Sequence, residues 1–317
     1  MAGLYDELTI FTGNSNPELA EEICAHIDIP LGRAEVFKFA NDNTFVRILE
    51  SVRENDVFVV QTFAAPINDA IMEMLILIDT LKRASAGRVT AVIPYFGYGR
   101  TDKKDQPRVP ITARLVAKLV GVAGADRVLT LDLHAGQIQG FFSIPGDVLT
   151  SFHILSDYFL RKTLHDPVIV TADLGFAKKG RNFAAKLRAP MAFVEKRRRG
   201  NDSMAEALTV IGDVDGRDVV IVDDEVDTGG SVCQAVEIVK EHGARDIYLS
   251  FVHPVLSHPA VERLRALPVK EIVTTNTIPL APEKRLPNMT ILSIGPLLAE
   301  VIRRAHEGRS VGEMFNE

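Results

Sequence analysis

The chain has 317 residues, of which 46% are hydrophobic and 25% are charged, and this is the composition of an ordinary globular protein long enough for two domains. Its formal net charge of −6 argues against broad binding to nucleic acid. The two cysteines, Cys24 and Cys233, provide no disulfide framework and no Cys-x-x-Cys motif, so we expect a reducing, cytoplasmic location.

Strand-like and helix-like runs alternate along the whole chain. Short β-branched or apolar runs predict strands at residues 8–12, 57–61, 89–94, 128–131, 168–172, 192–194, 219–222, 247–251 and 271–275. Periodic apolar positions predict helices at residues 18–25, 67–83, 111–122, 152–160, 177–187, 232–241, 259–266 and 296–305. Alternation of this kind predicts an α/β protein with parallel sheets.

The sequence gives no sign of a membrane or secretory segment. The first seven residues contain no basic region and no long apolar run, so no signal peptide is visible. The most apolar stretch, Ile71 to Leu81, contains Glu73 and Asp79 and is too short to span a bilayer. We therefore expect a core-facing helix there and no membrane association.

Two segments of the chain resemble each other, residues 124–134 and residues 243–253, and each follows a helix that follows a β-branched strand. We infer two copies of one α/β unit, residues 1–149 and 150–317, although chance similarity between helix–loop–strand segments is the alternative. The first copy has about ten extra residues within positions 98–108. A long charged loop after a strand is typical of an active-site lid, and its composition also allows a disordered surface loop.

The segment 219–231 carries the most informative pattern. Four β-branched residues lead into Asp223 and Asp224, and Asp227-Thr228-Gly229-Gly230-Ser231 precedes a helical pattern. This order predicts a buried strand, a tight loop and a helix N-terminus, whose backbone N–H groups and hydroxyl groups bind phosphate. The two aspartates accept hydrogen bonds and suit sugar hydroxyls. We therefore predict a sugar-phosphate site, and the alternative is an acidic surface loop that caps a helix.

Seven segments, met in order along nearly the whole chain, carry further patterns: Phe39-Ala40-Asn41-Asp42-Asn43, residues 88–95, Arg100-Thr101-Asp102-Lys103-Lys104-Asp105, Asp132-Leu133-His134, residues 137–142, residues 222–231 and residues 273–279. Together these segments resemble those of the ribose-phosphate pyrophosphokinase family. The loop at 222–231 alone resembles a signature that this family shares with phosphoribosyltransferases. All of them at the family's spacing form a specific match.

The resemblance implies a fold, a reaction and an assembly. The fold is α/β, with two tandem phosphoribosyltransferase-like domains, each a mostly parallel sheet flanked by helices, and the last residues can pack back on the first domain. The reaction transfers diphosphate from ATP to C1 of ribose 5-phosphate and releases AMP, with Mg²⁺ as the cofactor. The assembly is a homohexamer built from dimers, with each ATP site shared between subunits.

The resemblance also assigns roles to residues. For catalysis it implies Lys196, Arg198 and Arg100. For ATP binding it implies Phe39, Asn41, Asp42, Asn43, Arg100, Thr101 and Asp105. For ribose 5-phosphate it implies Arg198, Asp223, Asp224, Asp227, Thr228, Gly229, Gly230 and Ser231, and for the metal it implies His134 and Asp173. Magnesium prefers carboxylate oxygen to imidazole nitrogen, so we favour Asp173 over His134 as a direct ligand.

Several of these residues have an alternative explanation. Phe39 also fits a core aromatic residue near a strand end, and His134 alone is more often a structural histidine. The basic run at 196–199 also fits a solvated surface.

Four residues depart from the family pattern: Thr101 replaces a glutamine, Asn43 an acid and Phe176 a glycine, and Glu225 adds an acid. The changes at 43 and 176 leave open a non-catalytic paralogue that regulates a true synthetase. The loop at 222–231 alone also permits a phosphoribosyltransferase, which the lysine-rich lid disfavours.

Overall fold

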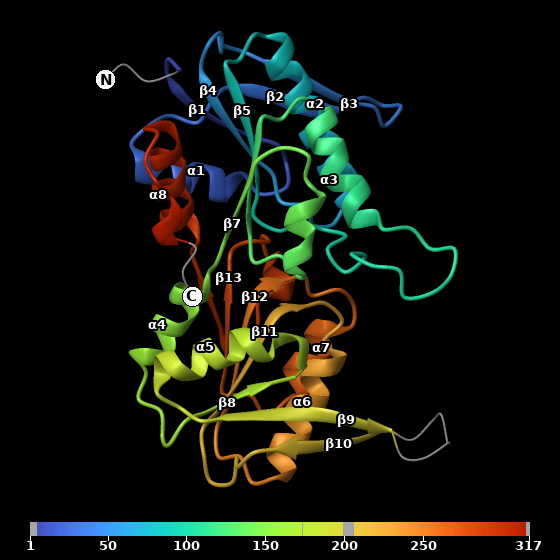
Figure 1. The fold of residues 1–317 in the computed structure, drawn as a ribbon, viewed down its shortest axis with the longest axis vertical. Coiled ribbons are helices and arrows are strands. Elements are labelled where there is room, and N and C mark those ends of the chain that lie inside the picture. Colours follow the sequence, from blue (N-terminus) through green and yellow to red (C-terminus); the bar gives the residue numbers. More distant parts are fainter. Residues whose placement is uncertain (1–4, 173, 199–205, 315–317) are drawn as a thin grey trace. The chain divides into compact units, whose positions relative to one another are not determined.

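The computed structural model describes residues 5–172, 174–198 and 206–314, with the backbone alone at positions 174, 196–198, 206–208 and 313. These residues form two compact units (Figure 1). Unit 1 contains the described residues of 1–150, 277–279 and 293–316, and unit 2 contains those of 151–276 and 280–292. The C-terminal part of the chain therefore returns to the unit in which the chain began.

Unit 1 is built on a five-stranded sheet in which all neighbouring strands are parallel. Its order is β1 (Leu8–Thr12), β4 (Asp56–Val60), β5 (Arg88–Ile93), β6 (Arg127–Leu131) and β7 (Gly146–Leu149). The accompanying elements are α1 (Pro17–Ile27), α2 (Ile67–Arg83), α3 (Thr112–Val122), η1 (Gly136–Phe141), α8 (Gly295–His306) and η4 (Gly312–Met314). Strands β2 (Ala34–Lys38) and β3 (Thr44–Ile48) form a separate antiparallel hairpin.

Unit 2 is built on a seven-stranded, mostly parallel sheet. Its order is β10 (Glu206–Ile211), β9 (Met191–Arg198), β8 (Val168–Thr171), β11 (Val219–Val226), β12 (Ile247–Pro254), β13 (Glu271–Thr275) and β14 (Met289–Leu292). The β9–β10 pair is antiparallel and the other neighbours are parallel. The accompanying elements are α4 (Phe152–Leu160), η2 (Leu174–Phe176), α5 (Ala177–Leu187), α6 (Gly230–Glu241), α7 (Ala260–Ala266) and η3 (Pro282–Lys284).

The predicted α/β class with mostly parallel sheets is confirmed. Every residue of β4 is buried, as are the first four residues of β11, because such strands are covered on both faces. Each sheet contributes to its own apolar core, one led by residues such as Val59, Leu77 and Ala91 and the other by residues such as Val170 and Ile221. Across the described residues, no helix combines the length and the apolar character that crossing a bilayer requires.

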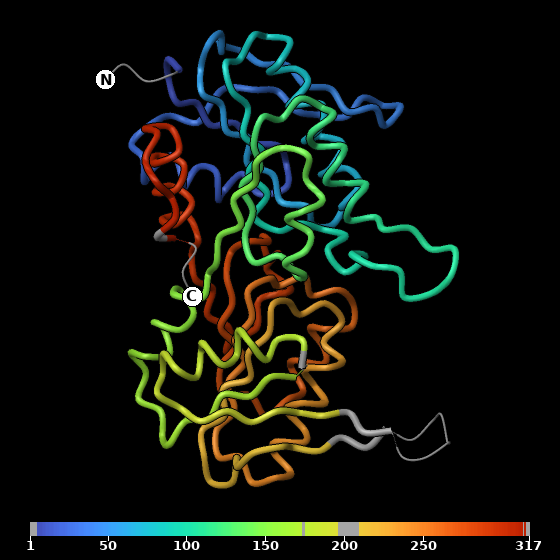
Figure 2. Tube along the Cα trace, in the orientation of Figure 1, coloured from blue at the N-terminus to red at the C-terminus, as the bar shows by residue number. Residues whose placement is uncertain are grey.

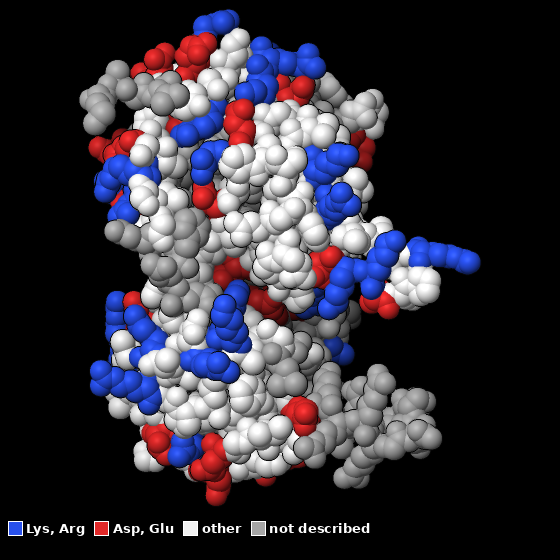
Figure 3. Space-filling model, in the orientation of Figure 1, with Lys and Arg blue, Asp and Glu red and all other residues white. Residues whose placement is uncertain are grey.

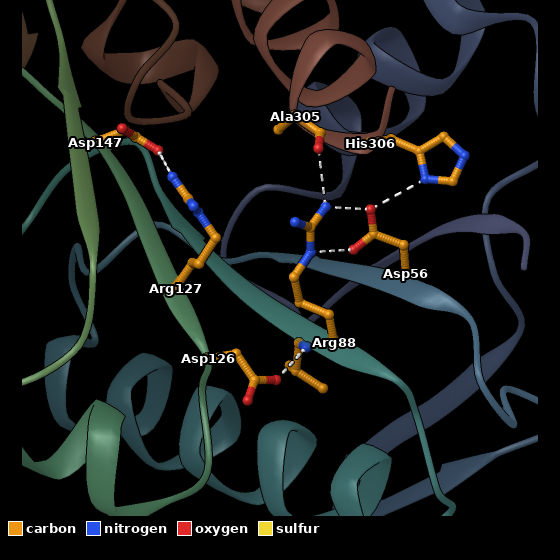
Figure 4. A network of polar contacts seen from close by, with 8 residues as sticks. Asp56, Arg88, Asp126, Arg127, Asp147, Ala305 and His306 are labelled. Carbon is orange, nitrogen blue, oxygen red and sulfur yellow. Dashed lines mark hydrogen bonds and ion pairs between the residues drawn. The ribbon is translucent and has the colours of Figure 1, made fainter. Parts of the chain in front are cut away.

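A buried ion-pair network ties the end of α8 to the sheet of unit 1 (Figure 4). Asp56 has a fully buried side chain, and its Oδ1 accepts a hydrogen bond of 2.7 Å from Arg88 Nε. His306 Nδ1 lies 3.0 Å from Asp56 Oδ2, and Arg88 Nη2 donates to the carbonyl oxygen of Ala305 at 3.0 Å. Removing one partner from such a buried set is costly, since it leaves a buried charge without compensation.

Candidate functional site

The first two acids of the 222–231 segment lie within strand β11. The predicted strand end at Val222 is wrong, because β11 continues to Val226 and pairs with β12 as far as Val226 opposite Pro254. Asp224 is consequently buried, with 8% of its surface exposed, and Asp223 is half-buried. The backbone N–H of Asp224 donates to Asp223 Oδ1 at 2.9 Å. The carboxylate of Asp223 is thus held against the backbone of the residue that follows it.

The loop after β11 is shorter than the sequence predicts, because α6 begins at Gly230 and the prediction placed its start at Val232. Gly229 caps the helix with a φ of 77°, a left-handed conformation that favours glycine. Glycine has no side chain with which to cap the helix, and the first turn of α6 holds no acidic residue. The helix start therefore offers backbone N–H groups and a positive dipole end to an anion. Thr228 and Ser231 flank it with exposed side chains.

Three predicted segments extend from adjacent strands of unit 2. Strand β8 lies between β9 and β11, and both pair with it in parallel. Because parallel strands end at the same edge of a sheet, the carboxyl ends of these three strands share one edge. Lys196 and Arg198 lie in the last residues of β9, although their side chains are outside the described part of the chain. Asp173, which follows β8, is outside the described residues altogether.

In unit 1 the predicted lid connects β5 to α3 and projects from the body of the unit. Figure 2 draws it as a long blue-green loop, and blue Lys and Arg atoms gather at the same place in Figure 3. Arg100, Lys103, Lys104, Asp105 and Arg108 are all exposed. The position of the loop and its exposed lysine and arginine side chains therefore suit it to bind an anionic ligand.

The lid is anchored at its root by hydrogen bonds whose partners the sequence does not reveal. Asp102 is buried, with 7% of its surface exposed, and its Oδ2 accepts a hydrogen bond from Gln137 Nε2 of η1. The hydroxyl of Thr101 donates to the carbonyl oxygen of Tyr98 at 2.7 Å, so Thr101 closes a turn within the lid. Tyr98 itself has a φ of 65° and donates through its hydroxyl to Asn68 Oδ1 at 2.8 Å.

His134 follows the neighbouring strand β6 and lies beside the lid root. A Cβ atom placed on Gly99 would be 3.4 Å from the Cβ atom of His134. The His134 side chain is exposed, whereas Asp132, two residues earlier, is buried and accepts a hydrogen bond from Thr150 Oγ1 at 3.1 Å. The structure therefore brings His134 and the lid together at the carboxyl ends of β5 and β6.

The segment 39–43 forms the tip of the β2–β3 hairpin. Its turn is closed by hydrogen bonds from the N–H of Phe39 to the carbonyl oxygen of Asn43 and from the N–H of Asp42 to that of Phe39, both 2.9 Å long. Phe39 is 48% exposed, so the alternative of a core aromatic residue is wrong. Its ring lies 5.2 Å and 5.4 Å from those of Phe37 and Phe45. These contacts orient Phe39 at the exposed tip.

Lys38 organises the charge at the hairpin tip, and sequence reasoning missed it. Its Nζ donates to Asp42 Oδ1 and to Asp69 Oδ2, each at 2.8 Å. The hydrogen bonds that Lys38 donates to the carboxylates of Asp42 and Asp69 raise the pKa of Lys38 above its ordinary value. Asp42 therefore contributes to a charge cluster at the tip of the hairpin. Its φ of 67° places it in the left-handed region of this tight turn.

Within the residues that the structure describes, no group of three or more His, Cys, Asp or Glu side chains is arranged to hold a metal ion. Of the two predicted metal residues, His134 is the one within the described part of the chain, and its side chain is exposed. Phe176, which replaces the family's glycine, lies half-buried with the Lys179 ammonium 5.5 Å from its ring centroid. Each predicted binding segment that is described occurs at the carboxyl end of a strand or at the hairpin tip.

Comparisons with known proteins agree on one family. Residues 8–124 match the model of the N-terminal domain of ribose phosphate pyrophosphokinase, and residues 201–316 match that of the phosphoribosyl synthetase-associated domain. A ribose-phosphate pyrophosphokinase of Caldanaerobacter subterraneus subsp. tengcongensis is 50% identical over 316 residues, which are 99% of this chain and 100% of the relative. One of Clostridium acetobutylicum is 48% identical over 312 residues, or 98% of each chain.

The comparison of folds points to the same family. The crystal structure of phosphoribosylpyrophosphate synthetase from Mycobacterium smegmatis is similar to this chain with a TM-score of 0.90 and 42% identity. The similarity covers 96% of this chain and all of the other. Sequence and fold therefore point to the same group of enzymes over nearly the full length.

Proposed function

The chain belongs to the ribose-phosphate pyrophosphokinase family, and from this premise we propose how its residues carry out the reaction. An enzyme of this family transfers the diphosphate group of ATP to the C1 hydroxyl of ribose 5-phosphate, with AMP as the leaving group. Such a transfer needs positioned substrates and compensation of negative charge more than covalent assistance. The observation that carries the assignment of the sugar site is the acidic end of β11 followed at once by the glycine cap of α6.

Ribose 5-phosphate binds at this end of β11. Asp223 and Asp224 accept hydrogen bonds from the sugar hydroxyls, since charged acceptors make strong hydrogen bonds to such groups. The phosphate binds at Asp227-Thr228-Gly229-Gly230-Ser231, where the α6 N-terminus attracts an anion. The absence of an acidic residue from the first turn of α6 supports this assignment, because a carboxylate there would compete for the same N–H groups.

ATP binds to the lid and to a hairpin tip. Phe39 stacks on the adenine ring, with Asn41, Asp42 and Asn43 as polar neighbours, and its 48% exposure supports this role. On the lid, Arg100 and Asp105 contact the nucleotide. Thr101 contributes through the turn that its hydroxyl closes with Tyr98.

Three cations compensate the charge that develops in the transition state. Arg100 does so from the lid, and Lys196 and Arg198 do so from the end of β9. Groups that are aimed beforehand at developing charge commonly account for the largest share of catalysis. The exposed side chain of Arg100 and the ends of β8, β9 and β11 at one sheet edge support this assignment.

We propose Mg²⁺ as the metal, with His134 and Asp173 as the residues assigned to metal binding. Mg²⁺ keeps several waters and binds through one or two carboxylates together with substrate phosphates, so a preassembled protein cage is not needed. The exposed His134 beside the lid root fits contact through a metal-bound water. When bound, the metal neutralises charge on the nucleotide phosphates.

The proposal extends to domains, assembly and location. We assign residues 1–149 and 150–317 to two phosphoribosyltransferase-like domains and expect a dimer-based homohexamer that shares its ATP sites. The exposed Phe39 at the tip of a hairpin supports contact with a neighbouring subunit. Consumption of ATP and the two free cysteines, Cys24 and Cys233, support a cytoplasmic enzyme.

The test is an assay of AMP release with ATP and Mg²⁺, with and without ribose 5-phosphate. AMP that forms only with the sugar phosphate, and not after metal removal with EDTA, is the expected result. A folded protein that binds ribose 5-phosphate but releases no AMP would instead favour a regulatory paralogue. Turnover of phosphoribosyl diphosphate with a nucleobase and without ATP would favour a phosphoribosyltransferase.

Replacing Gln137 by alanine raises the KM for ATP about 10-fold, because a buried carboxylate that loses a hydrogen bond costs about 1–3 kcal/mol. The affected group is Asp102 at the lid root, so the lid loses part of its orientation. Steady-state kinetics with each substrate varied in turn measures the effect, and the KM for ribose 5-phosphate stays unchanged. Gln139→Ala on the same short helix is the control, and an equal effect from it would refute the role of Gln137.

A further inference from the structure

Arg263 of α7 contacts the loop that follows β11. Its Nη1 donates to the carbonyl oxygen of Thr228 at 2.9 Å. The same nitrogen would lie 3.7 Å from a Cβ atom placed on Gly230, so the guanidinium flanks the first residue of α6. It also lies close enough to Cys233 to lower the pKa of that thiol, against the larger effect of burial, which raises it. Arg263 therefore runs from the loop to the first turn of the helix.

The hydrogen bond to Thr228 determines which way one peptide group faces. In a trans peptide the C=O and N–H groups point to opposite sides. With the Thr228 oxygen directed to Arg263, the N–H of Gly229 points away from Arg263. The glycine at position 229 would otherwise let this peptide turn at little cost, since glycine accepts positive and negative φ alike. Gly229 has a φ of 77°, so the observed orientation is one of several that are open to it.

The surrounding charge makes a cation useful at this place. Asp223, Asp224 and Glu225 lie in the last part of β11, which ends at Val226, and Asp227 follows it, so four carboxylates lie within five residues. A phosphate group next to them experiences repulsion that the α6 dipole offsets only in part, because a helix terminus carries about half an elementary charge. The guanidinium of Arg263 adds a full positive charge on the flank of Gly230.

We propose that Arg263 is a positioning residue for the 5-phosphate of the sugar substrate, and this inference rests on the proposed function of the 227–231 loop. Arg263 holds the Thr228 carbonyl oxygen on one side of the loop and thereby presents the Gly229 N–H to the phosphate on the other. Its charge offsets the acids of β11. The residue acts on binding of the sugar phosphate and not on the reacting diphosphate of ATP.

The experiment compares Arg263→Met, Arg263→Lys and Arg265→Met in the full-length protein. Arg265 is an exposed arginine of the same helix, and its substitution changes the net charge equally. AMP release is measured with ribose 5-phosphate and ATP varied in turn, and thermal unfolding reports on the fold. The wild-type protein is assayed first, because failure of the wild type to release AMP contradicts the proposed function and not the role of Arg263.

With an active wild type, Arg263→Met raises the KM for ribose 5-phosphate about 10-fold, as expected for the loss of a hydrogen bond that involves a charged group. The kcat stays within about threefold, the KM for ATP is unchanged, and Arg263→Lys recovers part of the loss. An unchanged KM for ribose 5-phosphate in Arg263→Met overturns the inference. So does an equal rise in Arg265→Met, which would reveal a general charge effect.

Discussion

Replacing Lys196 by alanine lowers kcat for AMP formation by about 10²–10³-fold, the usual effect of removing one preorganised group that stabilises transition-state charge. The KM values for ATP and ribose 5-phosphate change far less, because the interaction strengthens only as charge develops on the transferring diphosphate. Lys196 lies near the end of β9, one strand away from β8 and two from β11 with its acids. Initial rates over a grid of both substrate concentrations separate the two parameters.

The matched control is Lys118→Ala, which removes an exposed lysine from α3 and leaves kcat unchanged. Guanidinium and ammonium groups differ in geometry, so Lys196→Arg recovers only part of the rate. A raised KM with an unchanged kcat in Lys196→Ala would show that this residue contributes to substrate binding and not to stabilisation of the transition state.

Replacing Asp224 by alanine raises the KM for ribose 5-phosphate by about 10–100-fold, because charge-assisted hydrogen bonds contribute about 1.5–3 kcal/mol each. Asp224 is 8% exposed within β11, so little water surrounds its carboxylate. Solvent therefore screens the hydrogen bonds between this carboxylate and the sugar only weakly, and their loss has a large effect. Calorimetric titration with ribose 5-phosphate in the absence of ATP measures the effect directly.

Two further variants sharpen this result. Asp224→Asn keeps the volume and one acceptor oxygen but loses the charge, so its affinity falls between those of the wild type and Asp224→Ala. Glu241→Ala removes an exposed acid from the far end of α6 and leaves the affinity unchanged. An unaltered affinity in Asp224→Ala would remove this carboxylate from the sugar site.

The central strands and most helices follow from the sequence, because their physical signal is local. The buried parallel strands are short β-branched runs, and the helices at Ile67–Arg83, Phe152–Leu160 and Ala177–Leu187 have the bounds that their apolar periodicity predicts. Parallel strands covered on both faces must be apolar throughout, and this makes them easy to recognise.

The strands that sequence reasoning missed lack this signal. Strands β2, β3 and β14 are half-exposed and mix polar with apolar residues, while β7 begins with a glycine. Strand β10, in the antiparallel pair with β9, was missed as well. The extension of β11 through three acids was missed for a related reason, because pairing with β12 maintains a strand where composition favours a loop.

At the candidate site, the sequence indicates which loops matter but not which distant side chains support them. The Asp102–Gln137 and Thr228–Arg263 hydrogen bonds each join residues 35 positions apart. The sequence reveals neither pairing, since each pair is brought together by the packing of separate elements. Phe39 is the converse case, because the motif indicates its role and only the structure gives its exposure.

The return of the chain to unit 1 has a consequence for synthesis on the ribosome. His306 contacts Asp56 across 250 residues of sequence, and residues 277–279 and 293–314 also belong to unit 1. Until these segments leave the exit tunnel, the Asp56 carboxylate lacks its contact with His306, and the α1 face that receives α8 lacks that helix. The first unit to emerge is therefore the last to be completed. The folding of unit 1 can finish only after the whole of unit 2 has been translated.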